Sequence, residues 1–243
     1  MDYLPVYEIL KEAAQKWPTN PAVHDDYGTI NFQQLFTEAE ELRNHLLKLG
    51  IKKGMGIGVM AANGRNFITG IFATVGTGAA VMPMSPQLKA AEITDILKDA
   101  KLHAIIDDRS SIQPLENIET VIPMQKGSFR FAFSNIPASV PFAPFVEQPA
   151  FIRFTSGTTG KSKGVIVSHH SVMERIIAAN NGLQLGPADT VVWVLPMAYH
   201  FIVYIVLYVK YGAAIAVAQD FLAKHIIDTA NQHNGTLLYA SPV

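Results

Sequence analysis

Apolar residues recur with helical spacing in some segments of this chain and in short consecutive runs in others. The first segment keeps helical spacing from residue 6 to residue 17, and Pro18 ends it. Strands are expected at 22–24 and 29–32, joined by a turn at 25–28. A long amphipathic helix at 33–49 stops before Gly50. The chain therefore opens with a helix, a hairpin and a second helix.

From residue 56 the pattern alternates between strands and helices. We expect strands at 56–60, 79–82 and 103–107, separated by helices at 63–76 and 90–101, with Asn63 and Ser85 as N-caps. A second run predicts strands at 150–154, 164–168, 190–195, 214–218 and 236–239, with helices at 169–183 and 221–233 and a third ending at 208. This alternation predicts an α/β fold of layered, largely parallel sheets with helices on both faces.

The periodicity fails between residues 127 and 149, where four prolines stand among scattered phenylalanines. We interpret this stretch as a connection that is ordered by burying Phe131, Phe133, Phe142 and Phe145. It divides the chain into an N-terminal α/β subdomain at 1–149, ending in this Pro/Phe-rich connection, and a second α/β subdomain at 150–243.

Composition excludes several classes of protein. The chain has 243 residues, is 49% hydrophobic and carries a net charge of −1, so it can bury a sizeable core but has no electrostatic footprint for nucleic acid. It has no cysteine, which rules out disulfides, thiolate metal sites and cysteine nucleophiles. Without a recognisable signal peptide, the expected location is cytoplasmic.

The apolar stretch at 193–209 raises the question of a membrane span. Pro196 and His200 interrupt it, Lys210 closes it, and it is shorter than the roughly 20 residues that a spanning helix needs. We therefore expect a buried strand, turn and helix, with no transmembrane segment.

The most informative segment is 154–164, Phe-Thr-Ser-Gly-Thr-Thr-Gly-Lys-Ser-Lys-Gly, between two strand candidates. Backbone N–H groups in such a glycine-rich loop can turn toward an anion, while hydroxyl donors and lysines add hydrogen bonds and charge. A solvated loop without a ligand is the alternative. Gly160-Lys161-Ser162 ends like a Walker A loop, but that pattern requires glycine at the position of Thr155, and strand residues follow where a helix should begin.

The segment from Thr155 to Gly164 resembles the phosphate-binding motif of the adenylate-forming superfamily, Thr-Ser-Gly-Thr-Thr-Gly-x-Pro-Lys-Gly. It matches nine of the ten pattern positions, with x counted as free, and departs at Ser162. The resemblance implies binding of ATP and Mg²⁺, with Thr159 also near the metal. The implied phosphate-binding residues are Thr155, Ser156, Gly157, Thr158, Thr159, Gly160, Lys161 and Lys163.

A second segment, Val194 to Phe201, resembles the superfamily's Leu-Pro-x-Phe-His motif. By that resemblance Tyr199, His200 and Phe201 line the acyl pocket, and His200 is the candidate catalytic residue. The spacing is one residue longer than usual, so either Tyr199 or His200 takes the histidine position. A histidine with a purely structural role at a helix start is the alternative. The segment lacks the aspartate with which amino-acid-activating members pair the substrate ammonium, which favours a fatty or aromatic acid.

The resemblance implies that a small-molecule carboxylic acid attacks the α-phosphorus of ATP, giving an acyl-adenylate and pyrophosphate. Coenzyme A or a phosphopantetheine carrier protein would then accept the acyl group. The superfamily's Tyr-Gly-x-Thr-Glu and Thr-Gly-Asp segments and its mobile C-terminal domain are absent from this sequence.

We therefore expect the incomplete N-terminal part of the large domain of such an enzyme. It would be inactive without the C-terminal remainder and prone to self-association, because its sheet is interrupted after 236–239. The alternative is a naturally short nucleotide- or phosphate-binding module, regulatory or scaffolding, without catalysis.

Overall fold

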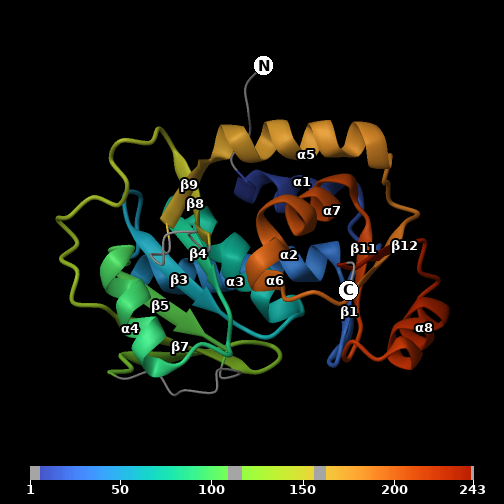
Figure 1. Ribbon diagram of the computed structural model, residues 1–243, viewed down its shortest axis with the longest axis horizontal. Helices are drawn as coiled ribbons and strands as arrows, with labels where there is room; N and C mark the ends of the chain where they lie inside the picture. The colour runs from blue at the N-terminus through green and yellow to red at the C-terminus, as the bar shows by residue number, and fades with distance from the viewer. Residues whose placement is uncertain (1–5, 109–116, 156–162, 242–243) are drawn as a thin grey trace.

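Two sheets and the helices around them make up the computed structural model, which describes residues 6–108, 117–155 and 163–241 (Figure 1). Within those residues one sheet has five strands, in the order β12 (Leu237–Tyr239), β10 (Thr190–Trp193), β11 (Ala214–Val217), β1 (Pro21–Asp25) and β2 (Gly28–Asn31). The other has seven: β6 (Thr120–Pro123), β7 (Ser128–Phe133), β5 (Ala104–Asp107), β3 (Gly56–Met60), β4 (Ala80–Met84), β8 (Pro149–Thr155) and β9 (Lys163–Ser168).

The helices fill the space between the sheets and cover their outer faces. They are α1 (Val6–Lys16), α2 (Phe32–Lys48), α3 (Arg65–Gly76), α4 (Ala90–Asp99), α5 (His169–Leu183), α6 (Met197–His200), the π-helix η1 (Phe201–Ile205), α7 (Val206–Tyr211) and α8 (Ala223–Gln232). Figure 1 shows α1, α2, α3 and α7 between the sheets and α8 outside the five-stranded one. The predicted layered α/β class is confirmed.

The prediction of largely parallel sheets is also confirmed. Six of the ten strand pairings in the described part of the chain are parallel. The four antiparallel pairings involve the strands at sheet edges: β2 on β1, β6 and β7 beyond β5, and β9 on β8. Each sheet thus has a parallel centre, and ligands of such sheets bind outside the carboxyl ends of the parallel strands.

The segment after residue 117 corrects the sequence interpretation. We expected an irregular connection from residue 127, but β6 and β7 form a hairpin that pairs with β5. Phe129 and Phe131 point into the core on alternate positions of β7, whereas the predicted core residues Phe133 and Phe145 are 43% and 80% exposed. The alternation of inward and outward residues on β7 covers only a few positions. Because a proline-rich stretch follows it directly, the sequence did not predict a strand there.

Both predicted N-caps are wrong. The N-cap of α3 is Gly64, and Lys89, whose backbone N–H donates to Glu92 Oε2 at 2.7 Å, is the N-cap of α4. Ser85 instead closes a turn after β4 by accepting from the backbone N–H of Gln87 at 3.3 Å. The loop between β3 and α3 is therefore longer than the pattern suggested, whereas α4 begins at Ala90 as predicted.

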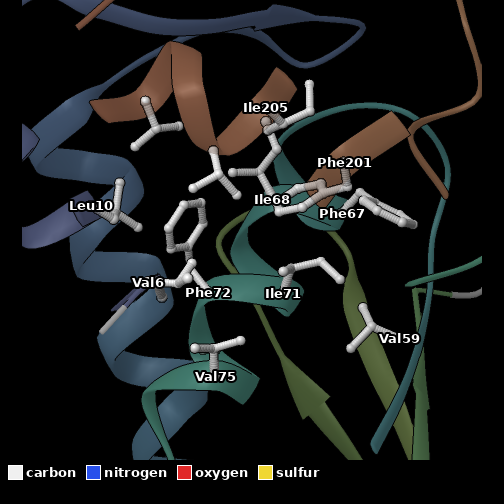
Figure 2. Close-up of a cluster of buried hydrophobic side chains, with 14 of the residues drawn as sticks. Val6, Leu10, Val59, Phe67, Ile68, Ile71, Phe72, Val75, Phe201 and Ile205 are labelled. Carbon is white, nitrogen blue, oxygen red and sulfur yellow. The ribbon is translucent and has the colours of Figure 1, made fainter. Parts of the chain in front are cut away.

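Apolar side chains from distant parts of the sequence form the central core between the sheets (Figure 2). Helix α3 lies at its centre and packs against α1 on one side and the η1 segment on the other. The labelled residues are Val6, Leu10, Val59, Phe67, Ile68, Ile71, Phe72, Val75, Phe201 and Ile205, all at most 3% exposed. Burial of this much apolar surface is the main favourable term in folding.

Strands from both sides of residue 150 enter each sheet. The N-terminal strand β1 lies beside β11, with Val23 opposite Ile215, and β8 lies beside β4. The sheets therefore do not follow the division at 1–149 and 150–243, which stays a prediction about folding units. The edge strand β12 exposes half of Leu238. Self-association through this edge likewise stays a prediction.

The apolar stretch at 193–209 forms the end of β10, then α6, η1 and most of α7. Residues of all these elements are buried in the core. No helix within the described ranges combines the length and apolarity needed to cross a bilayer.

A buried ion pair joins the two sheets. Arg65, at the start of α3, donates from Nε and Nη2 to the carboxylate of Asp25, at the end of β1, over 2.8 to 3.1 Å. The backbone N–H of Arg65 also donates to Asp25 Oδ2 at 2.9 Å, and both side chains are only 5% exposed. Gly64, at φ +141°, permits this approach, since a Cβ there would lie 3.0 Å from Asp25 Oδ2.

We predict that Arg65→Met destabilises the chain by about 3 kcal/mol or more, because it leaves the Asp25 carboxylate buried without a partner. The double change Asp25→Asn/Arg65→Met should cost less than the sum of the two single changes. Urea denaturation measures the free energies of unfolding. Lys11→Gln, which removes an exposed ion pair with Glu8, serves as the control and should change stability by at most about 0.5 kcal/mol. If Arg65→Met lowers the free energy of unfolding by less than about 1 kcal/mol, Arg65 is not the required partner of a buried Asp25 carboxylate.

His169 connects α5 to α1 and generates a pH prediction. Its Nδ1 accepts from the backbone N–H of Val6 at 2.9 Å, and burial lowers the pKa of His169 to about 4. Because the unfolded chain binds this proton near pH 6.5 and the folded chain only near pH 4, the stabilisation is complete above pH 6.5. It is lost as the pH falls from 6.5 to 4.

We predict that the unfolding free energy falls over that window by on the order of 2 kcal/mol from this group. His169→Gln keeps an acceptor for Val6 but cannot titrate, so its stability should depend less on pH. Urea denaturation at about pH 7 and about pH 4.5 compares the two proteins. Equal slopes of stability against pH in both would show that His169 does not titrate as described.

Candidate functional site

The predicted phosphate-binding loop joins two paired strands. β8 and β9 are antiparallel, and Thr155 and Lys163 form the last pair of the hairpin. The loop between them lies outside the described residues, so the roles predicted for Ser156, Gly157, Thr158, Thr159, Gly160 and Lys161 stay predictions, as do those of Thr155 and Lys163. The hairpin nevertheless determines where the loop begins and ends.

The loop starts at the carboxyl edge of the seven-stranded sheet. β8 is parallel to β4, which is parallel to β3, and β3 is parallel to β5, so these four strands end at the same edge. After β3 the chain enters α3 in the core between the sheets, whereas after β4 it enters α4 on the other face, where Ile93 packs in a second cluster. Adjacent parallel strands that lead to opposite faces leave a crevice at their carboxyl ends.

By the same rule we expect a crevice in the five-stranded sheet. β10 leads into α6, η1 and α7 between the sheets, and its parallel neighbour β11 leads to α8 on the outside (Figure 1). The residues that follow β10, from Val194 to Met197, belong to the second predicted motif. Both predicted motifs therefore lie at carboxyl edges of parallel strands.

Asn63 connects the two crevices. Its side-chain Nδ2 donates to the carbonyl oxygen of Leu195 at 2.9 Å, and its Oδ1 accepts from the backbone N–H of Met197 at 2.8 Å. Asn63 follows β3 in one sheet, and the turn that it binds follows β10 in the other. This amide, predicted as a helix cap, instead holds the turn that leads to His200.

His200 lies among aromatic rings at the end of the five-stranded sheet. We define the aromatic cluster as Trp193, His200, Tyr204 and Tyr239. Tyr239 stacks on Trp193 with ring centroids 5.0 Å apart, and its hydroxyl lies 3.4 Å from His200 Nδ1. The His200 ring also lies 6.2 Å from the Trp193 ring and 6.5 Å from the Tyr204 ring. The cluster joins the ends of β10 and β12 to α6 and η1.

Burial, and then the positive charge of Arg153, lower the pKa of His200. Burial also raises the pKa of Tyr239, so its hydroxyl stays protonated at neutral pH. At neutral pH the half-buried imidazole is therefore uncharged and has one nitrogen able to accept a proton.

The three predicted pocket residues occupy different environments. His200 belongs to the aromatic cluster, Tyr199 is 52% exposed, and Phe201 is fully buried against Phe67, Phe72 and Phe151. Phe201 is thus a core residue here. Its predicted place in a pocket wall, like the other two roles, stays a prediction, and the surroundings favour His200 for the histidine position of the motif.

The extra residue in this motif precedes the π-helix η1, in which each turn holds more residues than an α-helical turn. A π-helical turn accommodates an added residue without changing the direction of the following helix, and such turns are frequent at functional sites. η1 lets Phe201 and Ile205 enter the core while Tyr204 faces the aromatic cluster.

Several residues of this region escaped the sequence analysis. Tyr239, Tyr204 and Arg153 were not singled out, and Asn63 received another role. One signal was available for Tyr239, because it ends a predicted strand and carboxyl ends of parallel strands gather at one edge. The contacts of Asn63 cross between two sheets and have no local signature.

One cavity lies away from this region, and a second lies at the carboxyl ends of β1 and β11 in the five-stranded sheet. A mostly apolar one of about 400 Å³ lies between α4, β5 and β7, lined by residues that include Ile93, Leu97 and Phe133. A polar one of about 260 Å³ lies beside α8, where the rings of His24 and His233 stack at 4.1 Å. Among the described residues no group of three or more histidine and carboxylate side chains is arranged to bind a metal ion.

Comparison with known proteins identifies the relatives of this chain. The family model described as "AMP-binding enzyme" matches residues 10–243. Tyrocidine synthase 2 of Brevibacillus parabrevis is 24% identical over 225 residues, which cover 92% of this chain and 6% of that protein. The chain thus spans under a tenth of the length of this curated relative.

Solved structures share the fold. The N-terminal domain of FACL13 from Mycobacterium tuberculosis superposes with a TM-score of 0.78 at 19% identity, over 97% of this chain and 62% of that one. O-succinylbenzoate coenzyme A synthetase from Bacillus subtilis, in complex with AMP, gives a TM-score of 0.75 at 19% identity, over 96% and 61%.

We predict that Asn63→Ala destabilises the chain by about 2 kcal/mol, because it leaves the Leu195 carbonyl and the Met197 N–H without their partner. Asn63→Asp keeps the acceptor for Met197 but turns a carboxylate oxygen toward the Leu195 carbonyl, so it should also destabilise the chain. The control is Asn135→Ala on the surface. Urea denaturation followed by circular dichroism measures stability. Wild-type stability in the alanine variant would show that the two crevices are not joined through Asn63.

Proposed function

The chain belongs to the AMP-binding enzyme family, and on that premise we propose that it is the N-terminal part of an AMP-forming acid–thiol ligase. The observation that supports the proposal is the position of two predicted motifs. The hairpin of β8 and β9 holds the two ends of the predicted phosphate loop at the carboxyl edge of one sheet, and Asn63, which follows β3 at that edge, binds the turn of the second motif. The coverage of its relatives, 6% and 62%, supports a chain that works together with further sequence.

In the proposed reaction an oxygen of the substrate carboxylate attacks the α-phosphorus of ATP. A bond forms between that oxygen and phosphorus, the bond to the bridging oxygen breaks, and pyrophosphate leaves with the electron pair. A thiol, of coenzyme A or of a phosphopantetheine carrier, then attacks the acyl carbon and releases AMP. Such steps depend on positioning and on neutralising phosphate charge.

The residues of this chain would bind and orient the reactants. The loop from Thr155 to Lys163 would hold the phosphates through backbone N–H groups, hydroxyls and lysines, as proposed from its sequence. Mg²⁺, when bound near Thr159, would neutralise phosphate charge. The uncharged His200 would orient the acid at the mouth of the aromatic cluster, where water is partly excluded.

We further propose that the acid has no α-amino group, fatty and aromatic acids being the two candidates. The segment from Ala198 to Phe201 offers no carboxylate for a substrate ammonium, and a buried ammonium without a partner is costly. Both tyrocidine synthase 2 and a coenzyme A synthetase are among the proteins that this chain is similar to, so the family alone leaves the acid open.

We predict that Lys163→Ala weakens binding of Mg²⁺–ATP to this chain by roughly tenfold, the effect of losing one phosphate-bound cation. Lys52→Ala removes an exposed lysine elsewhere and should leave binding unchanged. Isothermal titration calorimetry measures both. Equal affinities in wild-type and Lys163→Ala would contradict the assigned role of the loop.

The reaction itself is tested by pyrophosphate exchange with a panel of carboxylic acids, using the product of the complete gene. We expect exchange with at least one acid that lacks an amino group. ATP binding without exchange would favour the alternative of a non-catalytic nucleotide-binding module.

A further inference from the structure

Arg153 lies on β8, two residues before the predicted phosphate loop. Side chains alternate between the two faces of a strand. Phe151 is fully buried in the core between the sheets, where its ring lies 6.3 Å from that of Phe201, and Ile152 packs in the cluster on the opposite face. Arg153 therefore shares the face of Phe151, toward His200 and Phe201, and its side chain is exposed.

The positive charge of Arg153 reaches the aromatic cluster. It lowers the pKa of His200 and opposes the burial that raises the pKa of Tyr239. No carboxylate in the described ranges shifts either group, and the guanidinium of Arg153 forms no ion pair with a described carboxylate. The local field is therefore positive, next to the partly exposed rings of Tyr204 and Tyr239.

These features fit an organic anion with an aromatic body. Guanidinium groups bind carboxylates through paired hydrogen bonds, and the partly exposed rings of Tyr204 and Tyr239 can pack against another ring, with the fully buried Trp193 beneath them. An α-amino acid is a poorer match, because its ammonium lies one carbon from the carboxylate and would be held beside the guanidinium. Like charges at that separation repel.

We propose that Arg153 binds the carboxylate of the substrate and selects aryl-substituted carboxylic acids over the corresponding α-amino acids. This inference rests on the proposed function for the identity of the acid as a substrate. It adds a specificity-determining residue outside both motifs and narrows the acid class to aryl-substituted acids.

The test compares two ligands that differ only by the amino group, 3-phenylpropanoate and L-phenylalanine, bound to the chain without ATP. Isothermal titration calorimetry gives both dissociation constants for wild-type, Arg153→Gln and Arg153→Lys. The matched control is Arg175→Gln, which removes the same charge from the exposed face of α5. Because Arg153 and Arg175 are exposed, all variants should unfold near the wild-type temperature.

We expect wild-type to bind 3-phenylpropanoate about tenfold more tightly than L-phenylalanine. Arg153→Gln should weaken binding of 3-phenylpropanoate by roughly fivefold and reduce the preference for 3-phenylpropanoate over L-phenylalanine. Arg153→Lys should retain part of the affinity and part of the preference. Arg175→Gln should behave like wild-type.

The inference is overturned if Arg153→Gln binds both ligands like wild-type, or if wild-type binds neither. Since these titrations contain no ATP, they separate the two proposals. Binding that depends on Arg153 in a protein whose complete gene product shows no pyrophosphate exchange would sustain the acid-binding role of Arg153 and refute the proposed function.

Discussion

The buried pair of Asp25 and Arg65 is the constraint on which the arrangement of the two sheets depends. Asp25 ends β1 in the five-stranded sheet, and Arg65 begins α3, which follows β3 of the seven-stranded one. Neither charge can be left alone in the interior without a large desolvation penalty, so the carboxyl ends of β1 and β3 have to stay together. Glu38 is also buried nearby, at 1% exposure; burial raises its pKa, and the charge of Arg65 acts in the opposite direction.

Because the carboxyl edges of the two sheets are held together, a residue with a short side chain can bridge them. The Asn63 amide, two residues before Arg65, reaches both the carbonyl of Leu195 and the N–H of Met197. Neither a buried ion pair nor a pair of hydrogen bonds made by one planar amide tolerates much displacement of its partners. The position of His200 thus follows from contacts made by residues 25 to 65, far away in the sequence.

The local elements could be predicted from the sequence because their signals are local. The bounds of β3 and α5 coincide with the predicted 56–60 and 169–183, since apolar spacing and flanking breakers define them. The position of β1 beside β11 could not be predicted, because the two strands are paired by long-range packing. The hairpin of β6 and β7 escaped for a different reason: its two inward phenylalanines form too short a pattern. Likewise, only tertiary contacts distinguish His200 in the aromatic cluster from exposed Tyr199 and buried Phe201.

The electrostatics of the region agree with the proposed chemistry. A ligase of this kind has to bring two anions, a carboxylate and a triphosphate, into contact, and their repulsion opposes the reaction unless cations stand beside them. The predicted loop supplies two lysines, and Arg153 supplies a third positive charge two residues before it. Arg153 also disfavours protonation of His200, so the imidazole remains a proton acceptor in a positive environment. Carboxylates in place of these cations would repel both the substrate carboxylate and the triphosphate. Such a site would suit a cationic ligand instead.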